Sequence, residues 1–393
     1  MRYTSEQPVG MTDTGYSRAQ RTVRASAVLL VLAPAIAVAQ VVKLDQPVST
    51  LSEPFSFVRG VRELSNGQLL IVDWIENRVV IADLTNNTVR RLMREGAGPQ
   101  EVRLPSGLVR LRGDTTLLYD DGNNRSHVLG ADGRSVRTIL ADVPGRGGLR
   151  GVDATGAFLY AIPAWSEGPK ALPNDSVQIV RWDPWARGEP QVTAVVQGTR
   201  YRKDRSPALQ PRLPMVGYAS QDSWVVAPNG ALVIVRATPY HLEIHMAGRP
   251  PIVGPSYTST TRAVTMDDKK RFIREFSAGS PVSGRGPNGG MGRAPQITEA
   301  EVTRMTGTAE WAERFPPFDA STVISGADGR IWVGAPLLPG ASPRYDVFDQ
   351  TGKRVMQVEL RAGRRIVHVG AKGIYAVADD ADGVQTIERY RVP

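Results

Sequence analysis

Two arginines occupy matching places in the sequence and have the chemistry to bind an anion. Arg59 and Arg150 each precede a Gly-Val pair at the start of an apolar segment. A guanidinium group recognises carboxylate or phosphate through paired hydrogen bonds, so two of them converging on one opening would suit a small anionic ligand. The alternative is that each arginine pairs with an acidic group of a neighbouring structural unit. The sequence leaves both interpretations open.

Three aromatic residues stand at or beside polar loops between apolar segments. These are Trp74, Trp165 and Tyr240. Large aromatic rings provide flat surfaces on which a sugar or a peptide side chain stacks. Together with Arg59 and Arg150 they form the ligand-binding set that we predict from the sequence, for a peptide or small anionic ligand.

Candidate metal ligands are few. His241, Glu243 and His245 alternate along one predicted strand and therefore share a face. At about 3.3 Å per residue the two histidines would lie ~13 Å apart, beyond the reach of one metal ion. The acidic loop at 379–382 has oxygen ligands for Ca²⁺ but lacks the Gly and distal Glu of an EF-hand loop, and a solvated turn explains it better. We predict no cofactor, with Ca²⁺ as the alternative.

Familiar catalytic motifs are absent from the sequence. There is no cysteine and no Gly-x-Ser-x-Gly segment. The glycines of 284–292 are not followed by Gly-Lys-Ser/Thr, so they do not form a phosphate loop. No catalytic residue is predicted, and the sequence favours a binding protein over an enzyme without deciding between them.

A repeat places these residues on strands. Val58–Thr138 contains the same pattern twice, and each copy has four short apolar segments separated by turns. Asp73 stands four residues before Asn77, and Asp120 stands four before Asn124; an Arg follows each Asn. Four strands in a repeat of about 45 residues predict a propeller blade. Because the two Asp recur at the same place, we expect them to bond backbone amides and hold the loops rather than to act in catalysis.

The linker between the two copies carries a family resemblance. Gly-x-Gly-Pro-x-Glu at 96–101, then Leu-Pro-x-Gly, then the Asp-x₃-Asn-Arg pattern resembles the NHL-type six-bladed β-propellers, and among them exported bacterial members. The resemblance is good over Val58–Thr138 and the C-terminal third. It implies a recognition platform with a ligand at the mouth of the central channel. Related rings include metal-dependent lactonases and lyases, so a hydrolase or lyase of that type is the alternative function.

The remaining chain fits this architecture. We predict an all-β, six-bladed β-propeller over residues 40–393, in which Val41–Leu44 supplies the missing fourth strand of the last blade and closes the ring. Residues 256–320 break the strand pattern. They predict an insert between blades four and five, with a helix at Lys269–Phe276, a glycine-rich tract, and a capping box from Thr298 to Glu301 before a second helix.

The first 39 residues predict export. Three arginines precede an apolar run at 25–39 that ends Ala-Val-Ala, which is typical of a cleaved signal peptide. The sequence therefore indicates a periplasmic or secreted protein that is not embedded in a membrane after cleavage, and we expect a monomer. The net charge of the chain is +9, or +7 without the four Arg, one Glu and one Asp of residues 1–39; it would attract anionic partners, but a solvated surface explains it better. Its arginines are scattered over strands and turns, which argues against nucleic acid, and a protein partner or an envelope-complex role stays open.

Overall fold

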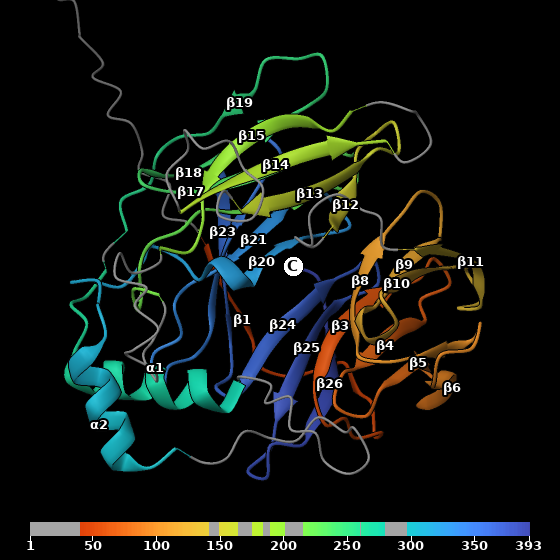
Figure 1. The fold of residues 1–393 in the computed structure, drawn as a ribbon, viewed down its shortest axis with the longest axis horizontal. Helices are drawn as coiled ribbons and strands as arrows, with labels where there is room; N and C mark the ends of the chain where they lie inside the picture. Colours follow the sequence, from red (N-terminus) through yellow and green to blue (C-terminus); the bar gives the residue numbers. More distant parts are fainter. Residues whose placement is uncertain are drawn as a thin grey trace, which may run out of the picture. The chain divides into compact units, whose positions relative to one another are not determined.

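Six separate sheets stand around a common axis in the residues that the structure describes (Figure 1). The structure is a computed structural model that describes residues 40–140, 149–163, 175–183, 189–200, 215–259, 261–279 and 297–393. The prediction of an all-β, six-bladed β-propeller is confirmed. The predicted export signal at 1–39, Trp165 and most of the glycine-rich tract at 277–293 lie outside the described residues; residues 277–279 of the tract end helix α1.

Each blade starts at the axis and its next strands step outward in antiparallel order. Blades one to three comprise β3 (Val58–Glu63), β4 (Leu69–Asp73), β5 (Arg78–Asp83), β6 (Thr88–Glu95) and β7 (Glu101–Val102); β8 (Pro105–Arg110), β9 (Thr116–Asp120), β10 (Arg125–Leu129) and β11 (Ser135–Leu140); and β12 (Leu149–Val152), β13 (Phe158–Pro163), β14 (Ser176–Trp182) and β15 (Gln191–Gln197).

Blades four to six repeat this order. They comprise β16 (Ser223–Val226), β17 (Leu232–Ala237), β18 (Tyr240–His245) and β19 (Ile252–Val253); β20 (Val323–Ser325), β21 (Ile331–Gly334), β22 (Arg344–Phe348), β23 (Arg354–Leu360) and β1 (Gln40–Leu44); and β24 (Arg364–Val369), β25 (Ile374–Asp379), β26 (Gln385–Tyr390) and β2 (Ser49–Thr50).

The strand that closes the ring differs from the one predicted. Val41–Leu44 belongs to β1, which pairs in parallel with β23 on the outer edge of blade five. The outer strand of blade six is instead β2, whose Ser49 and Thr50 pair with β26. The chain near its described start does close the ring, but the prediction that Val41–Leu44 does so was wrong. The apolar pattern of Val41–Leu44 marks a strand; it does not say which edge the strand covers.

The core lies between the blades. All five residues of β4 are buried, because the second strand of a blade is covered on both faces by neighbouring blades. One cluster joins Leu51 and Phe55, next to β2, with Tyr375 and Ile387 of blade six and Ile71 of blade one. This apolar seam binds the first blade to the last.

Two helices occupy the segment between β19 and β20. They are α1 (Met266–Gly279) and α2 (Glu299–Thr308), and α2 begins with the predicted capping box of Thr298 and Glu301. Ile273, Val302 and Met305 pack between the helices. With 14 and 10 residues, both helices fall short of the roughly 20 apolar residues that a bilayer requires, and no helix in the described part of the chain could span a membrane.

A test of the closure is the variant Gln385→Leu. The Gln385 side chain is buried, and its Oε1 accepts a 2.6 Å hydrogen bond from the amide of Val58 at the opposite end of the propeller sequence. Leaving a buried amide without an acceptor costs about 1–3 kcal/mol. We expect a lower urea midpoint for Gln385→Leu and little change for Gln191→Leu, whose side chain is exposed on β15. Equal midpoints for both variants would contradict this role of Gln385.

Candidate functional site

A cavity of about 960 Å³ lies where the inner strands of all six blades end. Residues at the ends of β3, β8, β12, β16, β20 and β24, and the turns that follow these strands, line it. Figure 1 shows β3, β8, β12, β20 and β24 bordering the centre of the ring. The cavity therefore occupies one mouth of the central channel, a common place for ligands because side chains from several elements converge there.

Basic side chains outnumber acidic ones in this cavity. Three carboxylates, Glu63, Asp114 and Asp153, face a larger set of cations, which consists of Arg62, Arg110, Arg112, Arg150 and Lys372. The cations come from blades one, two, three and six, and ring closure brings them together. The mouth is therefore electropositive.

The carboxylates are already engaged by other groups. Asp153 accepts hydrogen bonds from the Arg181 guanidinium, at 2.6 Å, and from two backbone amides of its own turn. The Tyr375 hydroxyl donates a 2.9 Å hydrogen bond to Glu63, and Asp114 holds the amide and hydroxyl of Ser65. Asp153 is thus paired with Arg181 and Asp114 with Arg62, and the five cations of the cavity still outnumber its three carboxylates.

The arginines are held less completely. Arg62 is 5% exposed; it reaches Thr116 and Asp114 of blade two, while its Nε has no hydrogen-bond partner. Burial, partly offset by Asp114 and reinforced by Arg110, lowers the pKa of Arg62 to about 10. Arg110 is exposed, and its guanidinium makes no hydrogen bond or ion pair with any described residue. The exposed guanidinium of Arg110 is therefore open to an anion.

A histidine and a serine complete the wall. Burial, with the nearby positive charges of Arg62 and Arg110, lowers the pKa of His368 to about 4, so its imidazole is neutral at pH 7. Ser325 Oγ is buried without a hydrogen-bond partner. Unsatisfied buried polar atoms are uncommon, and Arg62 Nε and Ser325 Oγ both belong to residues that line this cavity.

The structure separates the two arginines predicted to converge. Each is the extra residue of a β-bulge in an inner strand, so their backbone positions match as expected. Arg150 lines the cavity, lies 5.1 Å from the Trp224 ring centroid and donates a 2.9 Å hydrogen bond to the Trp224 carbonyl of blade four. Arg59 does not line the cavity; its guanidinium lies 5.3 Å from the Trp74 ring centroid, within its own blade.

The structure also separates the predicted aromatic residues Trp74 and Tyr240. Trp74 stands with Arg59 and packs edge-on against Phe57 at the other end of the inner strand. Tyr240 is 5% exposed, its ring packs against Phe318 and Phe348, and its hydroxyl contacts Asp346. Tyr240 is thus a core residue of blades four and five and offers no open stacking surface.

The cavity residues that the sequence did not reveal are Arg62, Arg110 and His368. A signal for two of them exists, because Val-Arg-Glu-Leu in blade one and Val-Arg-Leu-Arg in blade two place basic residues where the inner strand ends. Which side chains face the axis depends on the bulges in β3, β8, β12 and β24. That displacement cannot be read from one sequence.

The repeated Asp residues hold the linkers between blades. Asp73 accepts hydrogen bonds from the amides of Ser56 and Phe57, at 2.9 and 3.1 Å. Asp120 accepts one from the amide of Arg103, at 2.7 Å. The Asn77 and Asn124 that follow have φ of 46° and 50°, a left-handed conformation that Asn tolerates well. These contacts agree with the expected structural role, except that the amides belong to the preceding linker.

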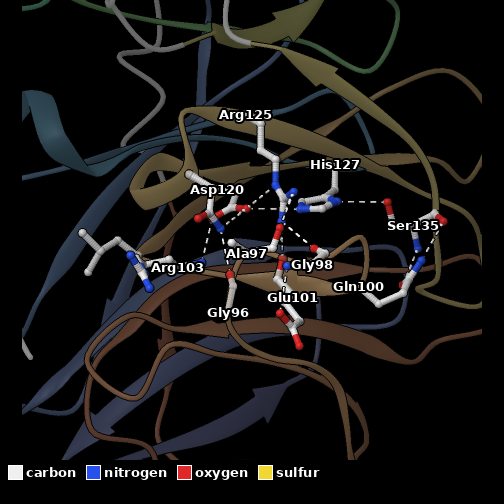
Figure 2. A network of polar contacts seen from close by, with 12 residues as sticks. Gly96, Ala97, Gly98, Gln100, Glu101, Arg103, Asp120, Arg125, His127 and Ser135 are labelled. Atoms are coloured by element: carbon white, nitrogen blue, oxygen red, sulfur yellow. Dashed lines mark hydrogen bonds and ion pairs between the residues drawn. The ribbon is translucent and has the colours of Figure 1, made fainter. Parts of the chain in front are cut away.

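Arg125 completes the same clamp (Figure 2). Its guanidinium pairs with Asp120 at 2.7 Å and donates hydrogen bonds to the carbonyls of Ala97, Gly98 and Glu101. In blade one Arg78 likewise contacts Asp73 and the carbonyl of Pro54. The Asn-Arg pattern therefore ties each blade to the chain that enters it.

One part of this network has the composition of a catalytic triad. His127 lies 3.0 Å from Ser135 Oγ and 3.3 Å from Asp120 Oδ2 (Figure 2). However, Asp120 and His127 are fully buried, and Asp120 also accepts from Asn123, Arg125 and the Arg103 amide. A carboxylate neutralised by Arg125 supports a histidine base poorly. The arrangement is suited to holding the linker in place.

Metal binding finds little support in the described residues. No group of three His, Asp or Glu side chains among them is arranged to hold an ion. Glu243 does lie between His241 and His245, at 3.4 and 3.2 Å, but Arg236 takes both of its oxygens at 2.9 and 3.0 Å. In the acidic loop, the Asp380 carboxylate accepts hydrogen bonds from the amides of Asp382 and Val384. The three carboxylates of the axial cavity likewise accept hydrogen bonds from neighbouring groups.

Comparisons with known proteins give a fold likeness only. No family model matches the chain, and no curated protein matches it. Among solved structures, a DUF4221 family member from Bacteroides vulgatus is 10% identical over 87% of this chain and 95% of its own, with a TM-score of 0.45. A gluconolactonase from Xanthomonas campestris is 10% identical over 87% and 91%, with a TM-score of 0.42. A Bacteroides fragilis protein described as exported is 12% identical over 90% and 100%, with a TM-score of 0.45.

The clamp is tested by Asp120→Asn. Burial alone would raise the pKa of Asp120, but hydrogen bonds from His127, the Arg103 amide, Asn123 and Arg125 outweigh burial and lower it. A lowered carboxyl pKa contributes stability above the unfolded pKa, near 3.9, and loses it as the pH falls through the folded pKa. Breaking a buried ion pair costs about 3–5 kcal/mol. We expect a loss of that order for Asp120→Asn at pH 7 in urea unfolding.

The difference between the wild type and Asp120→Asn should shrink as the pH falls below about 4. The control is Asp132→Asn, because the Asp132 side chain is 63% exposed and the two residues lie in the same blade. A constant difference between pH 7 and pH 3 would show that the Asp120 charge does not provide the stability.

Proposed function

We propose that this chain is an exported β-propeller that binds a small anionic ligand in the axial cavity. The observation that carries the proposal is the convergence of Arg62, Arg110 and Arg150, from three consecutive blades, on one cavity of about 960 Å³. Like charges that converge on one cavity repel, and burial of Arg62 costs further free energy unless a counter-charge compensates. A carboxylate, phosphate or sulfate group in the cavity would supply that counter-charge.

The hydrogen bonding of the residues that line the axial cavity favours ligand binding over catalysis. The carboxylates that could act as general bases accept hydrogen bonds from neighbouring groups, and the low pKa of His368 makes it a weak base. The unsatisfied groups are donors: the Nε of Arg62, the guanidinium of Arg110 and the hydroxyl of Ser325. Donors without a base suit the binding of a preformed anion. We place this binding outside the cytoplasm because residues 1–39 have the pattern of a signal peptide.

Replacing Arg110 tests the proposal directly. Sulfate is a suitable probe, because its charge does not change between pH 4 and pH 8. We expect Arg110→Gln to weaken sulfate binding, measured by isothermal titration calorimetry, by about tenfold or more, as losing a charge-assisted hydrogen bond predicts. The matched control is Arg134→Gln in the same blade, whose side chain is 81% exposed and outside the cavity. Equal affinities for both variants would remove Arg110 from the site.

The pH dependence of binding tests His368. An anion beside this imidazole stabilises the protonated form, so binding should raise its pKa from about 4 and take up a proton. Sulfate affinity should therefore rise as the pH falls from 7 toward 5, and His368→Gln should abolish the rise. Proton uptake can be measured by titration calorimetry in buffers of different ionisation enthalpy. Affinity independent of pH in the wild type would place the anion away from His368.

A further inference from the structure

A second cavity, of about 740 Å³, shares no residue with the axial cavity. Its walls come from the linkers that lead into blades four, five and six, the loop from Pro336 to Ala341 between β21 and β22, and helix α1. The axial cavity is lined by the turns after the inner strands, whereas these linkers precede the inner strands. The second cavity therefore opens on the opposite face of the ring.

Most of this wall is apolar and aromatic. Phe315 and Phe318 are buried beneath the cavity, Phe272 of α1 forms another side, and Leu337 on the loop is 55% exposed. Exposing a large aliphatic side chain beside buried aromatic rings is unfavourable in water. An apolar body seated between Leu337 and the phenylalanines would cover all of these surfaces.

Tyr218 fixes one side of the cavity. Its ring lies 4.5 Å from that of Phe315 and 4.9 Å from that of Phe272, measured between centroids. Its backbone has φ of 58°, which is rare for a bulky residue and strained. Strained residues of this type cluster at ligand sites, where the surrounding structure enforces them. The hydroxyl of Tyr218 donates to the carbonyl of Asp268 in α1, at 3.0 Å, and so fixes the helix against the blade.

Arg271 supplies a charge that its neighbours do not fully engage. Its side chain is 19% exposed, and its Nε is buried without a hydrogen-bond partner. It approaches Asp268 and Glu275 only to 3.6 Å, too far for a good hydrogen bond, and its one hydrogen bond with a described residue is 3.4 Å long, to Tyr218. Asp268 is instead held by Arg262, at 2.6 and 2.7 Å.

Asp268 and Glu275 offset the charge of Arg271 only through long ion pairs of 3.6 Å, which leave its hydrogen-bond donors poorly used. Glu275 is 69% exposed and can turn to solvent. Asp319 bonds the amide and hydroxyl of Ser321, at 2.9 and 2.7 Å, and Arg200 is exposed and positive. A guanidinium with open donors thus stands at the edge of an aromatic pocket.

We propose that this cavity is a second ligand site, which takes an amphipathic organic anion: an apolar ring or chain that carries one acidic group. The apolar body packs against Phe272, Phe315 and Leu337, and the acid bonds Arg271 in place of Glu275. The volume suits a small molecule, since such sites span about 300–1,000 Å³.

Anilinonaphthalene sulfonate is the probe, because it joins apolar rings to one acidic group and fluoresces on entering an apolar site. We expect saturable binding to the folded protein, about tenfold weaker in Arg271→Gln and in Leu337→Asp, and restored toward wild type in Arg271→Lys. Leu337 is exposed, so its replacement leaves the fold intact, which far-ultraviolet circular dichroism verifies for each variant.

Two variants serve as matched controls. Arg274→Gln removes an arginine from the same helix outside the cavity, and Val136→Asp adds a charge at a 66% exposed position of blade two; both should bind the probe as the wild type does. Saturating sulfate should not displace the probe, which separates this site from the axial one. The proposal is overturned by an absence of saturable binding, by displacement with sulfate, or by unchanged affinity in Arg271→Gln or in Leu337→Asp.

Discussion

Hydrogen bonding between the start and the end of the propeller sequence is the constraint on which the rest of the structure depends. Ser49 and Thr50 pair with β26, Phe55 pairs with Gln385 through both backbone groups, and the Gln385 side chain accepts the amide of Val58. These bonds span more than 300 residues of sequence. Because every inner strand contributes to the axial cavity, the arginines can stay close together only while this closure holds the ring.

The sequence predicts the blades well because their determinants are local. Asp-x₃-Asn-Arg gives a carboxylate for amides, an Asn for a left-handed turn and an Arg for the linker carbonyls, all within one hairpin. The closing strand escaped prediction for the opposite reason. Ser49–Thr50 has two polar residues and no hydrophobic pattern, and its place is set by contacts with residues far along the chain, whereas Val41–Leu44 looks like a strand but covers blade five.

The candidate site was predictable only in part. Arg59 and Arg150 share a bulged position, which the Arg-Gly-Val pattern correctly equates. A bulge redirects its side chain, and the neighbours then decide where the side chain goes. The Arg150 guanidinium packs on the Trp224 ring of the next blade, and Arg150 lines the axial cavity. The Arg59 guanidinium packs on the Trp74 ring of its own blade. Which tryptophan ring lies beside each arginine is decided by tertiary contacts, and one sequence does not show these.

The positive charge at the axis has a structural origin that also explains which arginine is left for a ligand. Inner strands are sheet edges, and their outward carbonyls need donors. Arg150 supplies one to the Trp224 carbonyl and Arg365 supplies one to the Val58 carbonyl, each reaching from its own blade to the next. Arg110 has no such carbonyl among the described residues and stays exposed. Satisfying the strand edges thus creates a cationic channel, and Arg110 is the arginine of the axial cavity whose guanidinium bonds no described residue.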